Sequence, residues 1–156
     1  MPPVDTRQPA RVLVVCTGNS ARSQMAEGFL RAYGAGVVEP ASAGMEPKGL
    51  NPHAVAVMAE KGIDISGQLS KAFSEPLARS MDYVITVCGA AETRCPVLPP
   101  SVHRLHWPLH DPARAEGTGE QVRVVFRQSR DEIERRVREF LATVNRPATR
   151  ALGAPG

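Results

Sequence analysis

The chain has 156 residues, of which 42% are apolar and 22% charged, and its net charge is +3. This length predicts one domain with a buried core. The positive charges are spread along the chain and do not form a basic surface interspersed with aromatic residues, so we expect no nucleic-acid partner. No apolar run approaches the roughly 18 residues of a membrane span, and the polar, proline-rich start lacks a secretory signal. We therefore expect no membrane partner and a cytoplasmic location.

Buried strands are predicted where short apolar runs occur, and helices where apolar residues recur at helical spacing. The strands are expected over residues 12–16, 37–43, 83–88 and 102–107, with Pro40 breaking the second. The helices are expected from Arg22 to about Tyr33, from Pro52 (after the N-cap Asn51) to Gly62, from Ser74 to near Met81, and along the apolar stripe from Val122 to Val144.

Alternating strands and helices indicate an α/β fold. We predict a single three-layer domain over residues 10–145, with a four-stranded parallel sheet and helices on both faces. Residues 1–9 and 146–156 are predicted to be flexible tails, the second because it is rich in Pro, Ala and Gly.

The segment 16–23, Cys-Thr-Gly-Asn-Ser-Ala-Arg-Ser, joins the first predicted strand to the first helix. Five residues between Cys16 and Arg22 allow the backbone to curl into a cup whose N–H groups bind a tetrahedral oxyanion. Arg22 can hold two oxygens of that anion, and the positive field favours the Cys16 thiolate, a nucleophile. Ser23 can donate to the sulfur. The alternative is a buried cysteine at a strand end followed by a capped helix. The candidate oxyanion-binding residues are Thr17, Gly18, Asn19, Ser20, Ala21, Arg22 and Ser23.

Cys88 and Cys95 are the other two of three cysteines in the chain. Because ligands of parallel sheets lie at the carboxyl ends of strands, Cys88 is expected on the same rim as Cys16, where it can attack the first thiol, and a third thiol can then take over the disulfide. Each cysteine could instead be a small buried hydrophobic residue. If residues 89–94 are helical, helical rise separates the two cysteines by roughly 10 Å, whereas a disulfide tolerates Cα separations of at most about 7 Å. The segment would then have to unwind.

Asp111 precedes Pro112 in a loop that follows the fourth predicted strand. An Asp-Pro pair is commonly a turn. Here the carboxyl can also reach the rim, where the charge of a bound oxyanion favours its protonated form. Asp111 is therefore a candidate general acid for the leaving oxygen.

Together, Cys16–Ser23, Cys88, Cys95 and Asp111-Pro112 resemble the thioredoxin-coupled arsenate reductases, which share the fold of the low-molecular-weight protein tyrosine phosphatases. The resemblance runs from about Arg11 to about Leu141. It includes Gly62-Ile63-Asp64-Ile65-Ser66, Cys95-Pro96-Val97-Leu98-Pro99-Pro100 and His106-Trp107-Pro108.

The resemblance implies a catalytic set of Cys16, Arg22, Cys88, Cys95 and Asp111. Cys16 would attack arsenate, for which phosphate or sulfate are analogues, and Asp111 would protonate the departing oxygen. Cys88 would then form a disulfide with Cys16 as arsenite leaves. Cys95 would take over that disulfide for reduction by thioredoxin. This activity would serve arsenic detoxification, with a weak phosphatase side activity, in a monomer without a cofactor.

Two departures from relatives bear on the site. Ala21 replaces a further cysteine of some relatives, and Lys71 replaces an Asp that helps some of them bind potassium together with Asn19, Glu27 and Ser42. Because the Lys71 ammonium can replace that ion, no potassium site is predicted. The spacing of the histidines gives no other metal site.

Three alternatives stay open. A tyrosine phosphatase would use the same loop and Asp-Pro, but it usually has an aromatic residue where this chain has Ala113. A non-enzymatic thiol sensor of redox state or oxyanions would not need the acid at Asp111. An arsenate reductase coupled to a small thiol and a glutaredoxin-like partner would not need Cys88 and Cys95.

Overall fold

A computed structural model describes residues 8–153, with the side chains of residues 8–144. Four parallel strands form its sheet in the order β2-β1-β3-β4. Their bounds are Ala10–Cys16 for β1, Val38–Gly44 for β2, Tyr83–Thr86 for β3 and His103–His106 for β4. Residues 12–15 of β1 have no exposed surface, as expected for an apolar strand covered on both faces.

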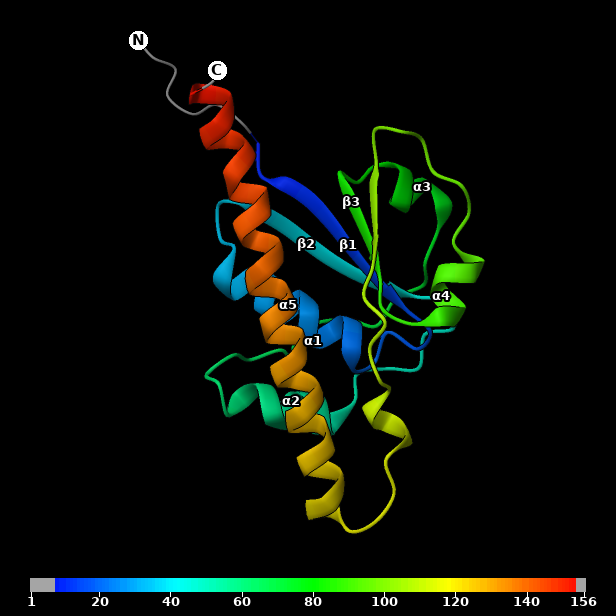
Figure 1. Cartoon of the computed structure of the whole chain (residues 1–156). Helices are drawn as coiled ribbons and strands as arrows, with labels where there is room; N and C mark the ends of the chain where they lie inside the picture. The colour runs from blue at the N-terminus through cyan, green and yellow to red at the C-terminus, as the bar shows by residue number, and fades with distance from the viewer. Residues whose placement is uncertain (1–7, 154–156) are drawn as a thin grey trace.

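The helices cover both faces of this sheet (Figure 1). On one face α1 (Arg22–Tyr33), α2 (Pro52–Ala59) and α5 (Gly119–Gly153) pack against one another. On the other lie α3 (Glu75–Arg79) and α4 (Gly89–Arg94), and a short 3₁₀ helix, η1 (Pro112–Arg114), precedes α5. The predicted three-layer α/β fold is confirmed.

The connections explain where the site lies. The chain leaves β1 to one side to form β2, then crosses back over β1 to form β3 on its other side. Because such crossovers are right-handed, α1 and α3 fall on opposite faces. The connections therefore diverge at the carboxyl end of β1, which is where open α/β sheets bind their ligands. Cys16 is the last residue of β1.

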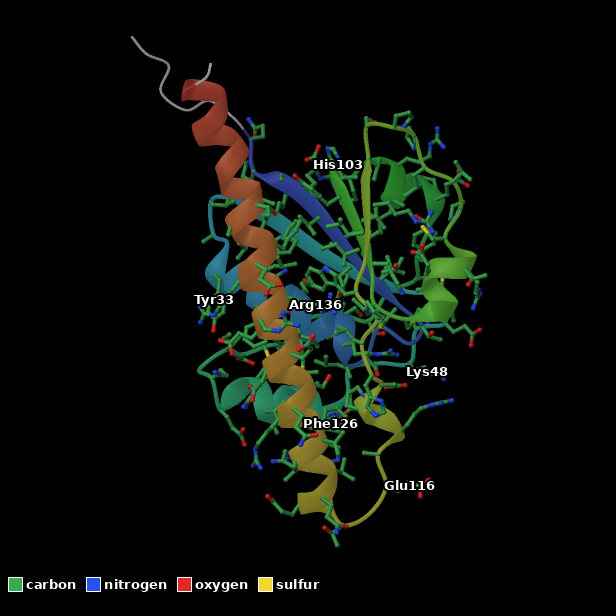
Figure 2. All side chains as sticks on the ribbon, in the orientation of Figure 1. Tyr33, Lys48, His103, Glu116, Phe126 and Arg136 are labelled. Atoms are coloured by element: carbon green, nitrogen blue, oxygen red, sulfur yellow. The ribbon has the colours of Figure 1, made fainter. Side chains whose placement is uncertain are left out.

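The apolar stripe of α1 fills the space between the sheet and α5. Met25, Phe29 and Leu30 are completely buried there. Phe126 of α5, labelled in Figure 2, stacks near His53 at the start of α2 with their ring centroids 5.2 Å apart. The periodicity read from the sequence thus identifies the buried faces correctly.

Several predicted boundaries are wrong. Pro40 does not break β2, because β2 is an edge strand, where a missing N–H donor is tolerated. β3 ends at Thr86 because Cys88 already caps the next helix, and α2 ends at Ala59 rather than Gly62. The part of the predicted tail from Arg146 to Gly153 belongs to α5, although it contains Pro147, a residue that usually ends or kinks a helix. Residues 1–7 and 154–156, the rest of the predicted tails, lie outside the described residues.

Over residues 8–153, no helix combines the length and the apolar character needed to cross a membrane.

Candidate active site

The loop between β1 and α1 turns its carbonyl groups outward. Cys16, Thr17, Gly18 and Ser20 accept backbone hydrogen bonds from Met45, Glu46, Lys48 and Asn51, at distances of 2.8 to 3.1 Å. In a trans peptide the N–H points away from the C=O, so the N–H groups of the loop face inward. The loop is therefore a cup of donors of the kind that binds anions.

Asn19 holds this cup in shape from a completely buried position. Its backbone has a φ of 46°, in the left-handed region that Asn tolerates better than most residues. Its side-chain amide donates to Ser23 Oγ at 2.8 Å and Ser42 Oγ at 2.9 Å, and its oxygen accepts the Lys71 N–H at 2.8 Å. Every polar atom of this side chain thus fixes the loop to its surroundings.

Cys16 lies at the bottom of the cup with 2% of its surface exposed. Its sulfur is 2.9 Å from Ser23 Oγ and accepts the Asn19 N–H at 3.2 Å. Since Ser23 Oγ already accepts a bond from the Asn19 amide, its own hydrogen is free to point at the sulfur. Two donors therefore converge on the Cys16 sulfur.

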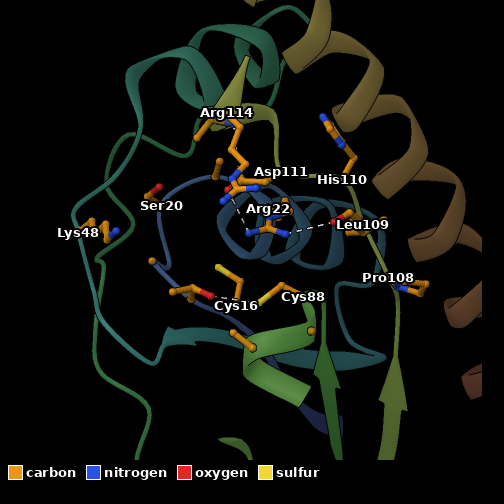
Figure 3. A pocket seen from close by; sticks show the side chains of 16 residues that line it. Cys16, Ser20, Arg22, Lys48, Cys88, Pro108, Leu109, His110, Asp111 and Arg114 are labelled. Carbon is orange, nitrogen blue, oxygen red and sulfur yellow. Dashed lines mark hydrogen bonds and ion pairs between the residues drawn. The ribbon is translucent and has the colours of Figure 1, made fainter. Parts of the chain in front are cut away.

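Arg22 reaches across the mouth of the cup toward the loop after β4 (Figure 3). Its guanidinium donates to the carbonyl of Leu109 at 3.1 Å and of Val87 at 3.4 Å, and its other nitrogen lies 3.5 Å from Asp111 Oδ2. The other oxygen of Asp111 accepts the Ala113 N–H at 3.0 Å. The ion pair brings the candidate general acid within reach of the cup.

These groups line one pocket of about 770 Å³. Cys16, Arg22, Asp111 and Cys88 all contribute to its wall, and Figure 3 shows the two cysteines next to each other. The predicted residues Thr17, Gly18, Ser20 and Ala21 also line it, while Asn19 and Ser23 support the loop from behind. Sequence reasoning missed two cationic residues of the rim, Lys48 and Arg114.

Cys88 is the N-cap of α4 and faces the pocket. Its sulfur accepts the Ala91 N–H at 3.4 Å and lies 3.2 Å from the hydroxyl oxygen of Thr17, the residue after Cys16. The candidate nucleophile Cys16 and a second thiol therefore share one cavity.

Cys95 does not line that pocket. It follows the last residue of α4 and is 7% exposed. Burial raises the pKa of its thiol, an effect that the Arg104 guanidinium opposes and the Glu92 carboxylate adds to. Residues 89–94 are helical, so Cys88 and Cys95 are held apart at opposite ends of α4. The structure thus brings together every predicted catalytic residue except Cys95.

The structure corrects the suggestion that the Lys71 ammonium replaces a metal ion. Lys71 binds Asn19 through its backbone N–H. The buried carboxylate of Glu27 instead forms an ion pair with Arg31 and accepts a hydrogen bond from Ser42 Oγ at 2.6 Å. Among residues 8–153, no group of three or more His, Cys, Asp or Glu side chains is placed to hold a metal.

Gln24 is a further supporting residue of the loop that sequence reasoning did not identify. It is completely buried, and its amide donates to the carbonyls of Asn19 at 2.9 Å and Leu69 at 3.1 Å. One signal could have found it: a polar residue in the first turn of a helix that is otherwise buried.

The fold and this pocket define an α/β protein in which a buried cysteine, an arginine and a loop of backbone donors meet at the carboxyl end of the central strand β1. Residues 11–150 match the model of the low molecular weight phosphotyrosine protein phosphatase family, and the chain belongs to that family. Over 132 residues it is 50% identical to an arsenate reductase of Shouchella clausii and 48% identical to one of Bacillus subtilis. These alignments cover 85% of this chain and 95% of each relative.

Solved structures agree. An arsenate reductase in its phosphate binding state superposes with a TM-score of 0.69 at 39% identity, covering 86% of this chain and 98% of the other. A thioredoxin-dependent arsenate reductase of Corynebacterium glutamicum gives 0.71 at 30% identity, covering 90% and 64%. A tyrosine phosphatase of Erwinia amylovora gives 0.72 at 19% identity, covering 90% and 96%, and shows the common fold.

Proposed function

We propose that this protein reduces arsenate to arsenite through Cys16, Cys88 and Cys95, and that thioredoxin regenerates it. The observation that carries the proposal is the pocket in which a cysteine with two converging donors, an arginine, a carboxyl and a second cysteine meet. The arsenate reductases to which the chain is similar support the same activity. The same reaction would serve arsenic detoxification.

In the first step the Cys16 thiolate attacks arsenic held by the cup and Arg22, and an S–As bond forms. Asp111, 3.5 Å from Arg22, supplies the proton with which an arsenate oxygen leaves as water. The cup is suited to this step because its inward N–H groups and the Arg22 guanidinium at its mouth supply donors for the anion.

In the second step the Cys88 thiolate attacks the Cys16 sulfur. The new S–S bond forms as the S–As bond breaks, and its electron pair stays on arsenic, which leaves as arsenite. In the third step Cys95 attacks Cys88, and Cys16 leaves as a thiolate. The dithiol of thioredoxin then reduces the Cys88–Cys95 disulfide. We place this cycle in a monomer in the cytoplasm, where thiols are kept reduced.

The main alternative is phosphatase activity, which needs only Cys16, Arg22 and Asp111. Of the described residues, those that line the pocket include no Phe, Tyr or Trp, and Ala113 stands after Pro112. The pocket therefore lacks an aromatic wall for a phosphotyrosine ring, which favours a small inorganic oxyanion as the substrate.

The test follows NADPH consumption with thioredoxin, thioredoxin reductase and arsenate, alongside hydrolysis of a small phosphate ester. Cys16→Ser should abolish both activities. Cys88→Ser and Cys95→Ser should each stop arsenate turnover and leave ester hydrolysis intact, which makes the ester an internal control for folding. Full arsenate turnover in Cys88→Ser or Cys95→Ser would refute the relay, and ester hydrolysis without arsenate reduction in the parent would favour the phosphatase.

A further inference from the structure

The carboxyl-terminal end of α4 is held by one arginine from the neighbouring strand β4. The guanidinium of Arg104 donates to the carbonyls of Glu92 and Pro96, both at 2.8 Å, and of Cys95 at 3.3 Å. The last carbonyls of a helix have no partner within the helix, and a cation is favourable there. Arg104 thus supplies the C-terminal partner of α4 and fixes the backbone of Cys95 itself.

The arginine is in turn held by a carboxylate. Glu92 Oε1 lies 3.5 Å from Arg104 Nη2 and accepts a hydrogen bond from Thr86 Oγ1 at 2.7 Å. The Thr86 bond, together with the Arg104 charge, lowers the pKa of Glu92 although partial burial raises it. His106 Nδ1 is 2.9 Å from the same Thr86 hydroxyl. Residues of β3, β4 and α4 therefore form one hydrogen-bonded network around Arg104.

This network holds α4 in a conformation that is incompatible with the third step of the proposed relay. Cys88 and Cys95 flank a helix of six residues, a separation of roughly 10 Å by helical rise. A disulfide needs Cα atoms within about 7 Å of each other. Closing the bond must therefore break the helical geometry of α4, whose last turn Arg104 holds through the carbonyls of Glu92 and Cys95.

We propose that Arg104 is a positioning residue for this exchange: it keeps α4 helical while the thiols are reduced and so sets the redox equilibrium of Cys88 and Cys95. The inference rests on the relay proposed above. In the exchange Cys95 gives up its proton to solvent, its sulfur bonds to Cys88, and the Cys88–Cys16 bond breaks to release the Cys16 thiolate. No net oxidation occurs in this exchange. The equilibrium between the two disulfides therefore depends on how strongly the surrounding residues stabilise the helical and the unwound forms of α4.

Removing Arg104 should destabilise the reduced, helical form more than the oxidised form. The Cys88–Cys95 pair should then favour the disulfide, and its reduction potential should become more negative. Loss of even one hydrogen bond to a charged group shifts such an equilibrium by about tenfold, which is about 30 mV for a two-electron couple.

The experiment uses the full chain with Cys16→Ser, which leaves Cys88 and Cys95 as the two thiols. Equilibration in glutathione buffers at pH 7, followed by acid quenching, alkylation and mass spectrometry, gives the potential. Arg104→Gln is compared with Arg104→Lys, which keeps the charge but not the planar fork. Arg79→Gln serves as the control, because Arg79 forms an exposed ion pair with Glu75 on α3.

We expect Arg104→Gln to shift the equilibrium at least about tenfold toward the disulfide, Arg104→Lys to shift it less, and Arg79→Gln to leave it unchanged. The reduced Arg104→Gln protein should also alkylate faster at Cys95, since its burial depends on α4. A potential unchanged by both Arg104 substitutions, or shifted equally by Arg79→Gln, would overturn the role of Arg104. Failure of the parent to form the Cys88–Cys95 disulfide at all would instead contradict the relay, and this inference with it.

Discussion

Cys88 and Cys95 occupy opposite ends of one short helix. The sulfur of Cys88 caps α4 by accepting the Ala91 N–H at 3.4 Å, and Cys95 follows its last residue. The two thiols of the proposed outgoing disulfide are thus separated by intact helical structure. In the proposed cycle, the Cys88–Cys95 disulfide can therefore form only if α4 unwinds.

This arrangement predicts a local change that depends on redox state. In the reduced protein the amides of residues 89–94 should be protected from hydrogen exchange. With the Cys88–Cys95 disulfide formed they should exchange freely, because the helix cannot coexist with the bond. Residues 12–15 and 84–87 should stay protected in both states, since residues 12–15 and 84–86 belong to the central strands and the Val87 N–H donates to the Val15 carbonyl at 2.9 Å. Equal protection of residues 89–94, with the disulfide verified, would mean that α4 survives oxidation.

A second prediction concerns Gly44 at the end of β2. A Cβ there would lie 2.8 Å from the Asn19 nitrogen and from the Thr17 carbonyl oxygen, both backbone atoms of the cup. Gly44→Ala should therefore displace the loop, at a cost of about 1–3 kcal/mol in the free energy of unfolding, and weaken the binding of phosphate measured by calorimetry.

Gly67→Ala is the matched control, because a Cβ at Gly67 meets nothing within 4 Å. It should leave both stability and phosphate binding as in the parent. If Gly44→Ala binds phosphate as tightly as Gly67→Ala does, the cup does not depend on this close approach.

A third prediction follows from Glu134 on α5. Burial raises the pKa of this carboxyl, but hydrogen bonds from Tyr33, Lys61 and Arg138 outweigh it and lower the pKa to about 2, from an ordinary 4.5. Tyr33 and Lys61 donate at 2.6 and 3.0 Å. Because the folded state favours the charged form, the stabilisation is fully present above about pH 4.5 and is lost as the pH falls from there toward 2.

The shift corresponds to about 3 kcal/mol in the free energy of unfolding. Urea unfolding should therefore show the parent losing more stability between pH 5 and pH 2 than Glu134→Gln, which cannot titrate. Glu139→Gln, which removes an exposed partner of Arg135, should retain the pH dependence of the parent. Identical pH dependence of the parent and Glu134→Gln would show that the lowered pKa of Glu134 does not cause the loss of stability at low pH.

The part of this site that is local in sequence could be predicted from it. The segment from Cys16 to Ser23 is local in sequence, since a buried strand, a short loop and a helix together form the cup at the carboxyl end of β1. The placement of Cys88 and Asp111 in the same pocket followed from the parallel sheet alone. The helix between Cys88 and Cys95 was considered from the sequence only as one possibility, which the structure shows to be the case.

Contacts between segments distant in sequence could not be predicted. Lys48 reaches the pocket because residues 45–48 bond to the carbonyls of the cup. Arg104 holds α4 only because β4 pairs with β3. Pro40 lies within a strand because β2 falls at the sheet edge. In each case a tertiary neighbour decides the outcome, and nothing in the adjacent residues indicates which neighbour that is.

The most direct measurement for the central claim is the trapping of the first disulfide. The Cys95→Ser protein, fully reduced, is treated with arsenate, quenched in acid, alkylated and digested for mass spectrometry. We predict a peptide pair joined through Cys16 and Cys88, because the thiol that would resolve it is gone. Phosphate in place of arsenate should give no such pair, since phosphorus is not reduced by thiols under these conditions. Recovery of Cys16 and Cys88 as free, alkylated thiols after arsenate treatment would contradict the account.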